Sequence, residues 1–342
     1  MSALLSVAPL AATRCKPPAP RLTFYNWGDY LAPEVAERFA AREDGAMVTQ
    51  DFYLSEGELY AKLKVGASYD VCVPIDYQLT RLQDHGFLRA LDLARLPGVA
   101  NLEPKFPPWR ADERHGGGCY AIPYLWGTTG IGYDSDKVDP APTSWKALFD
   151  LRYAGRISVI DSKGDVFDQA LLAAGLDINS NDRATIQGKI YPMLREQKQI
   201  LRAYDSNPAR ALVAGETYIA QIDSGDLMRA RKERPSLRYV IPQEGAALWV
   251  DYLAIPAASA QSALATRFIE FLLDPEIAAI NANFLRFATP NRVARERGLI
   301  ADADDPQVYP PADMLAKLYL SEHWVGQTES LVDKLWLELR GG

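Results

Sequence analysis

The chain alternates short apolar runs with amphipathic segments along most of its length. Residues 22–25 and 46–53 have the composition of buried strands, and a helix is expected to begin at Pro33 between them. Segment 55–65 opens with Ser and carries Glu three residues later, which is the spacing of a helix capping box. Residues 69–74 then predict another buried strand. This alternation favours βαβ units and an α/β fold.

Two later segments have the composition of strands that cross between lobes. Residues 127–133 mix glycine with β-branched residues, which suits an extended crossover better than a helix. Residues 249–256 are expected to return the chain to the first lobe. The other elements predicted here are helices beginning at Trp145 and Asp165, strands over 156–160 and 217–222, and an amphipathic helix over 260–273. Two crossings imply a clamshell.

The chain of 342 residues is too long for one typical core and suggests two lobes. We expect the first lobe to comprise residues 22–130 plus 254–298, and the second 131–253 plus 299–342. Residues 1–20 are expected to be a leader or a disordered N-terminus.

The N-terminal segment resembles the end of a secretory signal. Residues 3–12 are apolar and rich in small residues, although no basic segment precedes them. Lipid-modified cysteines of bacterial lipoproteins usually follow a small residue, whereas Arg14 precedes Cys15 here, so lipidation stays open. No later segment has the roughly 18 consecutive apolar residues that cross a bilayer. We therefore expect a signal peptide and a soluble mature protein.

Composition excludes some classes of partner. The formal net charge of −7 argues against nucleic acid and fits a cationic or neutral ligand, although mild acidity also simply keeps proteins soluble. The three cysteines lack metal-type spacing, and whether Cys72 and Cys119 meet stays open. The glycines at 116–118 are not followed by the Gly-Lys-Ser/Thr of a phosphate loop. We expect no cofactor and no metal.

Aromatic side chains and carboxylates recur together beyond strand-like runs. These groups are Trp27, Asp29 and Tyr30; Asp76 and Tyr77; Asp223 and Asp226; and Trp249 and Asp251. An alkylammonium ligand needs both components, because aromatic faces contact its methylenes and carboxylates bind its charged ends. Ordinary packing of aromatics at strand ends is the alternative for any single group.

Catalytic motifs are poorly represented. His85, His115 and His323 lie in no metalloprotease pattern, and no nucleophile elbow is present. We therefore expect a protein that is not an enzyme. Carboxylates beside aromatic walls leave a glycoside hydrolase as a remote alternative.

Several ordered motifs resemble the bacterial spermidine/putrescine-binding proteins, the periplasmic receptors of polyamine ABC importers. The motifs lie at 26–31, 73–77, 123–132, 249–256, 271–275, 288–291 and 309–313. The resemblance implies a type II periplasmic-binding fold, with two lobes joined by crossing hinge strands and a polyamine in the cleft between them. It also implies a membrane permease as partner, and we expect a monomer.

The resemblance assigns ligand-binding roles residue by residue. Trp27 and Tyr30 match the family's first aromatic wall, with Asp29 beside them, and Tyr77 matches an aromatic after a strand end. Trp249 and Asp251 match the pair that stacks on the alkyl chain and binds an amine. Further matched positions are Asp165, Asp226, Phe287 where members carry tyrosine, and Glu322 near a C-terminal polar position.

Departures from the family pattern leave the identity of the amine open. Ile75 stands where many members have serine, Ser162 replaces an acid of spermidine-type members, and the segment around Asp223 lacks a common tryptophan. We favour a putrescine-like diamine, with spermidine as the other polyamine. Another amine or a γ-amino acid is the nearest rival, but its carboxylate would need a basic partner, and none occupies the matched positions. A ligand sensor is a further alternative.

Overall fold

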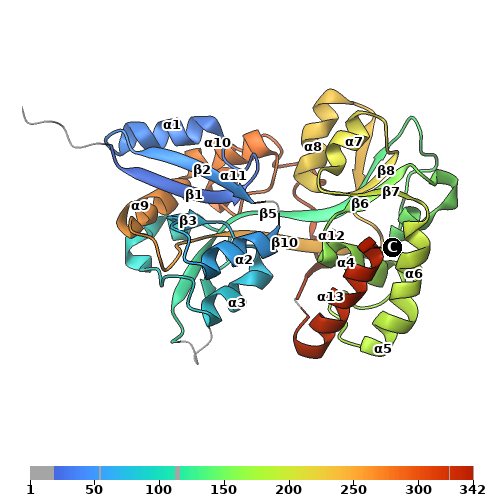
Figure 1. Ribbon diagram of the computed structural model, residues 1–342. Coiled ribbons are helices and arrows are strands. Elements are labelled where there is room, and N and C mark those ends of the chain that lie inside the picture. The colour runs from blue at the N-terminus through green and yellow to red at the C-terminus, as the bar shows by residue number, and fades with distance from the viewer. Residues whose placement is uncertain (1–18, 54, 112–115, 323, 342) are drawn as a thin grey trace, which may run out of the picture.

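The chain forms two α/β lobes. The computed structural model describes residues 19–53, 55–111, 116–322 and 324–341, so Cys15, His115 and His323 lie outside the described residues. The lobes lie side by side, and long strands run between them (Figure 1). The predicted two-lobed α/β architecture is confirmed. The strands follow the order β2 (Met47–Tyr53), β1 (Arg21–Trp27), β3 (Val71–Cys72), β10 (Ala246–Ala254), β5 (Cys119–Asp134), β8 (Ile219–Asp223), β6 (Ile157–Ile160) and β7 (Leu201–Asp205) across both lobes.

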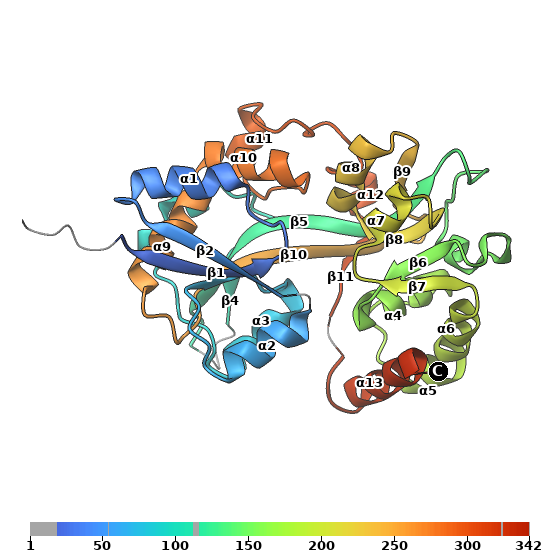
Figure 2. The same ribbon diagram turned by 45° about the horizontal axis from the view of Figure 1, so that its top comes forward.

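The first lobe begins with three parallel strands. They are β1 (Arg21–Trp27), β2 (Met47–Tyr53) and β3 (Val71–Cys72), connected by α1 (Pro33–Arg42) and α2 (Glu56–Lys64). β1 pairs with β2 over its whole length and with β3 on its other side. Ser55 caps α2 as predicted, because its hydroxyl accepts a hydrogen bond from the Glu58 backbone N–H. β1 runs toward the second lobe, so its last residues lie near the junction of the two lobes (Figure 2).

Two antiparallel strands connect the lobes. β5 (Cys119–Asp134) is far longer than the predicted crossover, because its apolar first half also pairs with β10 (Ala246–Ala254). In the second lobe β5 continues by pairing with β8 (Ile219–Asp223). The two predicted hinge crossings are therefore parts of one continuous ladder.

The second lobe surrounds a smaller set of strands. Its elements are β6 (Ile157–Ile160), β7 (Leu201–Asp205), β9 (Leu237–Val240), α4 (Lys163–Ala173), α5 (Arg183–Thr185), α6 (Tyr191–Lys198), α7 (Pro208–Val213) and α8 (Ser224–Glu233). The helix expected at Trp145 is only a short 3-10 turn, Trp145–Phe149. Ser144 caps it as predicted, but the Asp150 side chain accepts a hydrogen bond from the Arg152 N–H and begins another turn at once.

Each lobe has its own apolar core. Phe24, Phe39 and Phe268 belong to the core of the first lobe, and Trp145 and Phe167 belong to the core of the second. The helix predicted over 260–273 is α9 (Ser262–Leu272), and its apolar face is buried, at Leu264, Phe268, Phe271 and Leu272. It is followed by α10 (Pro275–Leu285), which is capped by Asp274.

The chain crosses between the lobes a third time, in addition to the two crossings by the predicted hinge strands; the lobe ranges expected from the sequence imply this crossing after residue 298. After α11 (Arg292–Glu296) it passes to α12 (Ala312–Leu315), β11 (Leu318–Leu320) and α13 (Gly326–Gly341) (Figure 2). β11 pairs with β10, and Val332, Leu335 and Leu339 of α13 lie in the second core.

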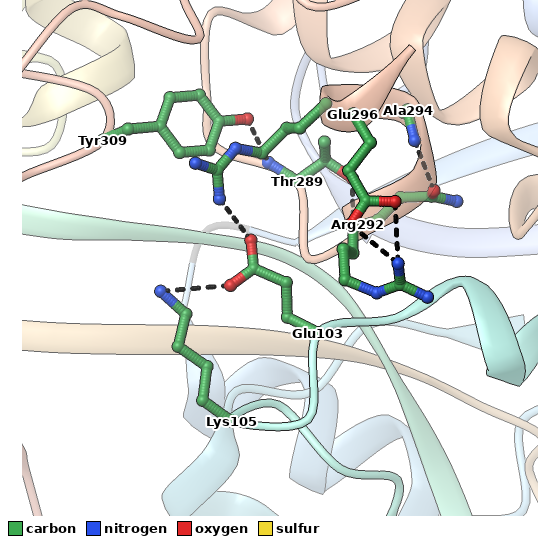
Figure 3. Close-up of polar contacts among 9 residues, drawn as sticks. Glu103, Lys105, Thr289, Arg292, Ala294, Glu296 and Tyr309 are labelled. Carbon is green, nitrogen blue, oxygen red and sulfur yellow. Dashed lines mark hydrogen bonds and ion pairs between the residues drawn. The ribbon is translucent and has the colours of Figure 1, made fainter.

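A polar cluster fastens the segment after α11 to the first lobe (Figure 3). Arg295 ion-pairs with Glu103, and its guanidinium lies 4.5 Å from the centre of the Tyr309 ring. The Tyr309 hydroxyl accepts a 3.0 Å hydrogen bond from the Thr289 N–H. Ile300 also packs in the cluster that contains Tyr25 and Tyr53 of the first lobe. We therefore propose that the first lobe extends to about residue 309 rather than ending at 298.

Candidate ligand-binding site

The end of β1 and the turn after it position the first aromatic wall, Trp27 and Tyr30. Trp27 is the last residue of the strand, and Asp29 adopts a left-handed conformation with φ of 53°, which aspartate tolerates better than most residues. This turn leads into α1, whose first residue is Pro33. Tyr30, within the turn, is buried.

Tyr30 contacts the buried carboxyl of β10. Its hydroxyl donates a 2.5 Å hydrogen bond to Oδ2 of Asp251, a residue that is only 4% exposed. The backbone of Tyr30 is held by Tyr124, whose hydroxyl donates to the Tyr30 carbonyl at 2.9 Å. Tyr124 in turn accepts a hydrogen bond from Asn281. Sequence reasoning missed both supports, since they come from β5 and α10.

Aromatic rings from several elements meet around this carboxyl. The Phe287 ring lies 5.6 Å from the ring of Tyr30 and 5.2 Å from that of Trp249, both centre to centre. Trp27 packs on Tyr53 at 4.4 Å. These aromatics are candidates for contact with methylenes and cation-π contact.

A second carboxyl lies at the end of β8 in the other lobe. Oδ1 of Asp223 accepts hydrogen bonds from the Thr129 hydroxyl at 2.7 Å and from the Trp249 indole N–H at 3.1 Å. Thr129 is the cross-strand partner of Asp223 in the β5–β8 ladder, so strand register sets this contact. The structure thus joins Asp223 and Trp249, which the sequence placed in separate groups.

Two further acids lie in the first turns of helices. Asp165 is near the start of α4 and Asp226 near the start of α8, where a helix dipole favours negative charge. Ser162 is the N-cap of α4, and its hydroxyl accepts a 3.4 Å hydrogen bond from the Asp165 N–H. Burial nevertheless raises the pKa of both acids.

The acids of the two ends influence one another. Burial, followed by the charges of Asp226 and Asp165, raises the pKa of Asp223 from 3.8 to about 8. Burial also raises the pKa of Asp251, and the charges of Asp76 and Asp223 raise it further, while the hydrogen bond from Tyr30 opposes the rise. A bound cation would favour the ionised forms of these acids.

Comparison with known proteins gives the family. The model described as bacterial extracellular solute-binding protein matches residues 34–308. The chain belongs to this family. It is 32% identical over 328 residues to a spermidine/putrescine-binding periplasmic protein of Salmonella typhimurium, covering 94% of this chain and 92% of the relative. It is also 32% identical over 342 residues to a putrescine-binding periplasmic protein of Pseudomonas aeruginosa, with the same coverages.

Solved structures agree with the two-lobed fold. A putative spermidine/putrescine ABC transporter protein from Listeria monocytogenes is 31% identical, with a TM-score of 0.85 over 94% of this chain and 99% of that one. A spermidine/putrescine substrate-binding protein from Streptococcus pneumoniae is 29% identical, with a TM-score of 0.79 and the same coverages. These neighbours support the predicted type II periplasmic-binding fold.

This solute-binding protein also places a cation beside its acids. Arg229, one helical turn after Asp226 on α8, forms an ion pair with it. Its guanidinium lies 5.2 Å from the centre of the Phe287 ring. Asp29 of the first lobe raises the pKa of Asp226 further, whereas Arg229 lowers it. Arg229 does not occupy a position matched to the family's ligand-binding residues, so the sequence analysis missed it. Its i,i+3 spacing from Asp226 can nevertheless be read from the sequence.

The structure brings Asp76 toward the Asp251 end of the site. Ile75 forms an isolated bridge with Asp251, and Asp76 follows it directly. Oδ1 of Asp76 accepts a 2.7 Å hydrogen bond from the Tyr77 N–H, which begins the short 3-10 turn Asp76–Gln78. The Tyr77 side chain is half-buried, and its role in ligand contact stays a prediction.

Glu322 has a different environment from the other predicted residues. It is exposed, and its backbone N–H donates a 2.7 Å hydrogen bond to Oδ1 of Asn179 in the second lobe. The Asn179 side chain also donates to the Leu320 carbonyl. The contacts described for Glu322 are thus those of a surface segment, and its role as a ligand residue stays a prediction.

Other candidate chemistry can be placed as well. Cys72 and Cys119 are buried free thiols, and burial raises the pKa of each. Across the described parts of the chain, no group of three or more His, Cys, Asp or Glu side chains could hold a metal ion. No helix among those same residues is long and apolar enough to cross a membrane.

Proposed function

We propose that this chain is a periplasmic substrate-binding protein that captures a polyamine, with a putrescine-like diamine favoured, and delivers it to the permease of an ABC importer. Family membership and relatives named for spermidine and putrescine support the class. The observation that carries the ligand is a set of carboxyls beside aromatic rings, with buried Asp251 at one end and half-buried Asp223 and Asp165 at the other.

The chemistry of the site matches a diammonium ion. Each ammonium loses hydration on entering and needs charge-assisted hydrogen bonds, which contribute about 1.5–3 kcal/mol each. Micromolar affinity corresponds to a binding free energy of roughly −8 kcal/mol, and the carboxyls at the two ends together with the aromatic rings are the groups that would supply it. The role proposed for the carboxyls is ligand binding, because the family is one of solute-binding proteins, and hydrogen bonds from Tyr30, Thr129 and Trp249 orient them for it.

Polyamine capture also explains how binding would be transmitted. The ligand-free acids repel one another when the lobes approach, and a cation between them removes this repulsion. The ligand would therefore favour the closed arrangement of the lobes. An importer that recognises the closed form would receive only loaded protein.

A γ-amino acid is the second candidate, and Arg229 is the observation that favours it. A carboxylate ligand needs a basic group, and Arg229 borders the site. Its charge is already shared between Asp226 and the Leu285 carbonyl, so we rank this ligand below a diamine.

Isothermal titration of the ligand-free protein with putrescine, cadaverine, spermidine and γ-aminobutyrate tests the proposal. We expect saturable one-to-one binding of a diamine. Saturable binding of γ-aminobutyrate without any amine would transfer the function to the second candidate. A folded protein that shows neither heat nor thermal stabilisation with any of the four would refute both.

A further inference from the structure

Arg229 bridges the two lobes at the edge of the proposed site. It belongs to α8 of the second lobe, and one of its guanidinium nitrogens donates to the carbonyl of Leu285, at the end of α10 in the first lobe. Another nitrogen forms the ion pair with Asp226. The guanidinium also faces the ring of Phe287. Three different contacts thus hold one protein cation in place.

The ion pair changes what Asp226 can offer a ligand. Asp226 lies within electrostatic reach of Asp223 on its own lobe and of Asp29 on the other. Among the residues that the structure describes, no Lys or Arg forms an ion pair with Asp165, Asp223 or Asp251, whereas Asp226 has Arg229. The carboxyls at the two ends of the site can therefore bind ligand cations. The carboxyl of Asp226, beside them, is neutralised by the protein itself.

We propose that Arg229 determines specificity by taking the place of a ligand ammonium at Asp226, so that the site accepts diamines and disfavours triamines. This inference rests on the proposed polyamine-binding function. A third ammonium would have to displace the guanidinium from Asp226 or lie beside it. Two positive charges in contact with the same carboxyl repel each other. Contacts to Leu285 and Phe287 oppose displacement, because they hold the arginine independently of Asp226.

The test compares putrescine and spermidine affinities by isothermal titration in the wild type, Arg229→Met and Arg229→Lys. Methionine keeps an apolar stem against Phe287 but removes the charge, whereas lysine keeps a cation. We expect Arg229→Met to raise the spermidine affinity relative to putrescine by about tenfold, equivalent to about 1.4 kcal/mol. Arg229→Lys should keep the ratio within about threefold of the wild type, a difference of under about 0.7 kcal/mol.

The double variant Asp226→Asn/Arg229→Met is the matched control. It removes the carboxyl that a third ammonium would use, so the ratio should return toward that of the wild type. This pattern would show that the arginine acts through Asp226 and not through a general loosening of the lobes. Thermal unfolding establishes that each variant folds, and Arg229→Gln replaces the methionine variant if that one does not.

Several outcomes would overturn the inference. An unchanged ratio in a folded, uncharged variant would do so while leaving the diamine function intact, because wild-type putrescine binding tests that function separately. A wild type that binds spermidine more tightly than putrescine would also contradict it. Selective loss of a measurable γ-aminobutyrate affinity in Arg229→Met would make the arginine a carboxylate receptor. A wild type that binds neither amine would remove both the function and the inference.

Discussion

Asp223 carries the most distinctive electrostatics of any residue in the site. Its pKa of about 8 in the ligand-free fold, against 3.8 ordinarily, means that the folded state holds this proton more tightly than the unfolded state. At pH values between these two pKa values the folded state binds more protons than the unfolded state, so the free energy of unfolding falls as pH rises. The carboxyl is thus maintained at a cost to stability, which a ligand cation would offset.

We predict that Asp223→Asn reduces this pH dependence. Asparagine removes the group that must ionise near its neighbouring acids. The ligand-free wild type should lose thermal stability between pH 6 and 8, and the variant should lose less. Thermal unfolding at several pH values in the absence of amines measures this. Parallel curves for the two proteins would show that Asp223 does not titrate in that range.

The same pKa predicts proton release on binding. A diamine favours ionised Asp223, so putrescine affinity should rise with pH up to about 8, by at most about tenfold per pH unit for each proton released. Titrations in two buffers with different ionisation enthalpies at one pH count the protons. An affinity that is independent of pH between 6 and 8 would contradict this account.

Trp249 combines two roles that substitution can separate. Its indole N–H donates to Asp223 and its ring meets Phe287. Trp249→Phe keeps an aromatic face but loses the donor, whereas Trp249→Ala loses both. We expect the alanine variant to weaken putrescine binding about tenfold, on the scale of about 1–2 kcal/mol for a desolvated cation-π contact, and the phenylalanine variant to weaken it less. Equal affinities in all three proteins would make Trp249 structural.

At the scale of elements, the start of α8 fits closely against the first lobe. A Cβ added at Gly225 would lie 2.3 Å from Cδ1 of Phe287, so only glycine allows this approach. Gly188, also in a helical segment, has nothing within 4 Å and provides a matched control. The glycine at 225 therefore sets how near α8 comes to the aromatic wall.

We predict that Gly225→Ala weakens putrescine binding and lowers stability by about 1–3 kcal/mol, the usual cost of overpacking. Gly188→Ala should be neutral or slightly stabilising, since alanine favours helix. Thermal unfolding and titration of both variants measure these effects. If the two substitutions behave alike, the contact with Phe287 does not control the site.

Local pattern predicted the elements better than their partners. The strand at 22–25 and the helix at 260–273 follow from apolar spacing alone. The strand at 46–53 is also present, but it is a mostly exposed edge strand and not the buried strand that its composition predicts. The pairing of Thr129 with Asp223 depends on the register between β5 and β8, which no local pattern specifies. The place where the chain leaves the first lobe depends on tertiary contacts in the same way, because Tyr309 is held by the Thr289 N–H, a contact that no local pattern specifies.

At the scale of the whole molecule, an ion pair joins surface helices of the two lobes. Arg81 of α3 (Leu79–Asp84) lies 3.8 Å from Glu329 of α13, and Arg81 also stacks over the Tyr60 ring. Both charged side chains are substantially exposed, so water and salt weaken their attraction. The buried acids, rather than this pair, should dominate closure.

We therefore predict that Glu329→Gln changes putrescine affinity by no more than about threefold, consistent with the 0–1 kcal/mol of exposed ion pairs. The small effect should disappear at high salt. Titrations at low and high ionic strength measure both. A loss as large as that of a buried acid would make this pair the main fastening between the lobes.

The central claim is that the carboxyls of Asp251 and Asp223 bind the two ends of a diamine, and titration of putrescine into the wild type and Asp251→Asn tests it most directly. We expect saturable one-to-one binding to the wild type and an affinity weaker by about 1.5–3 kcal/mol in the variant, the range of a charged hydrogen bond. Equal affinity in the two folded proteins, or no saturable binding to the ligand-free wild type, would contradict the claim.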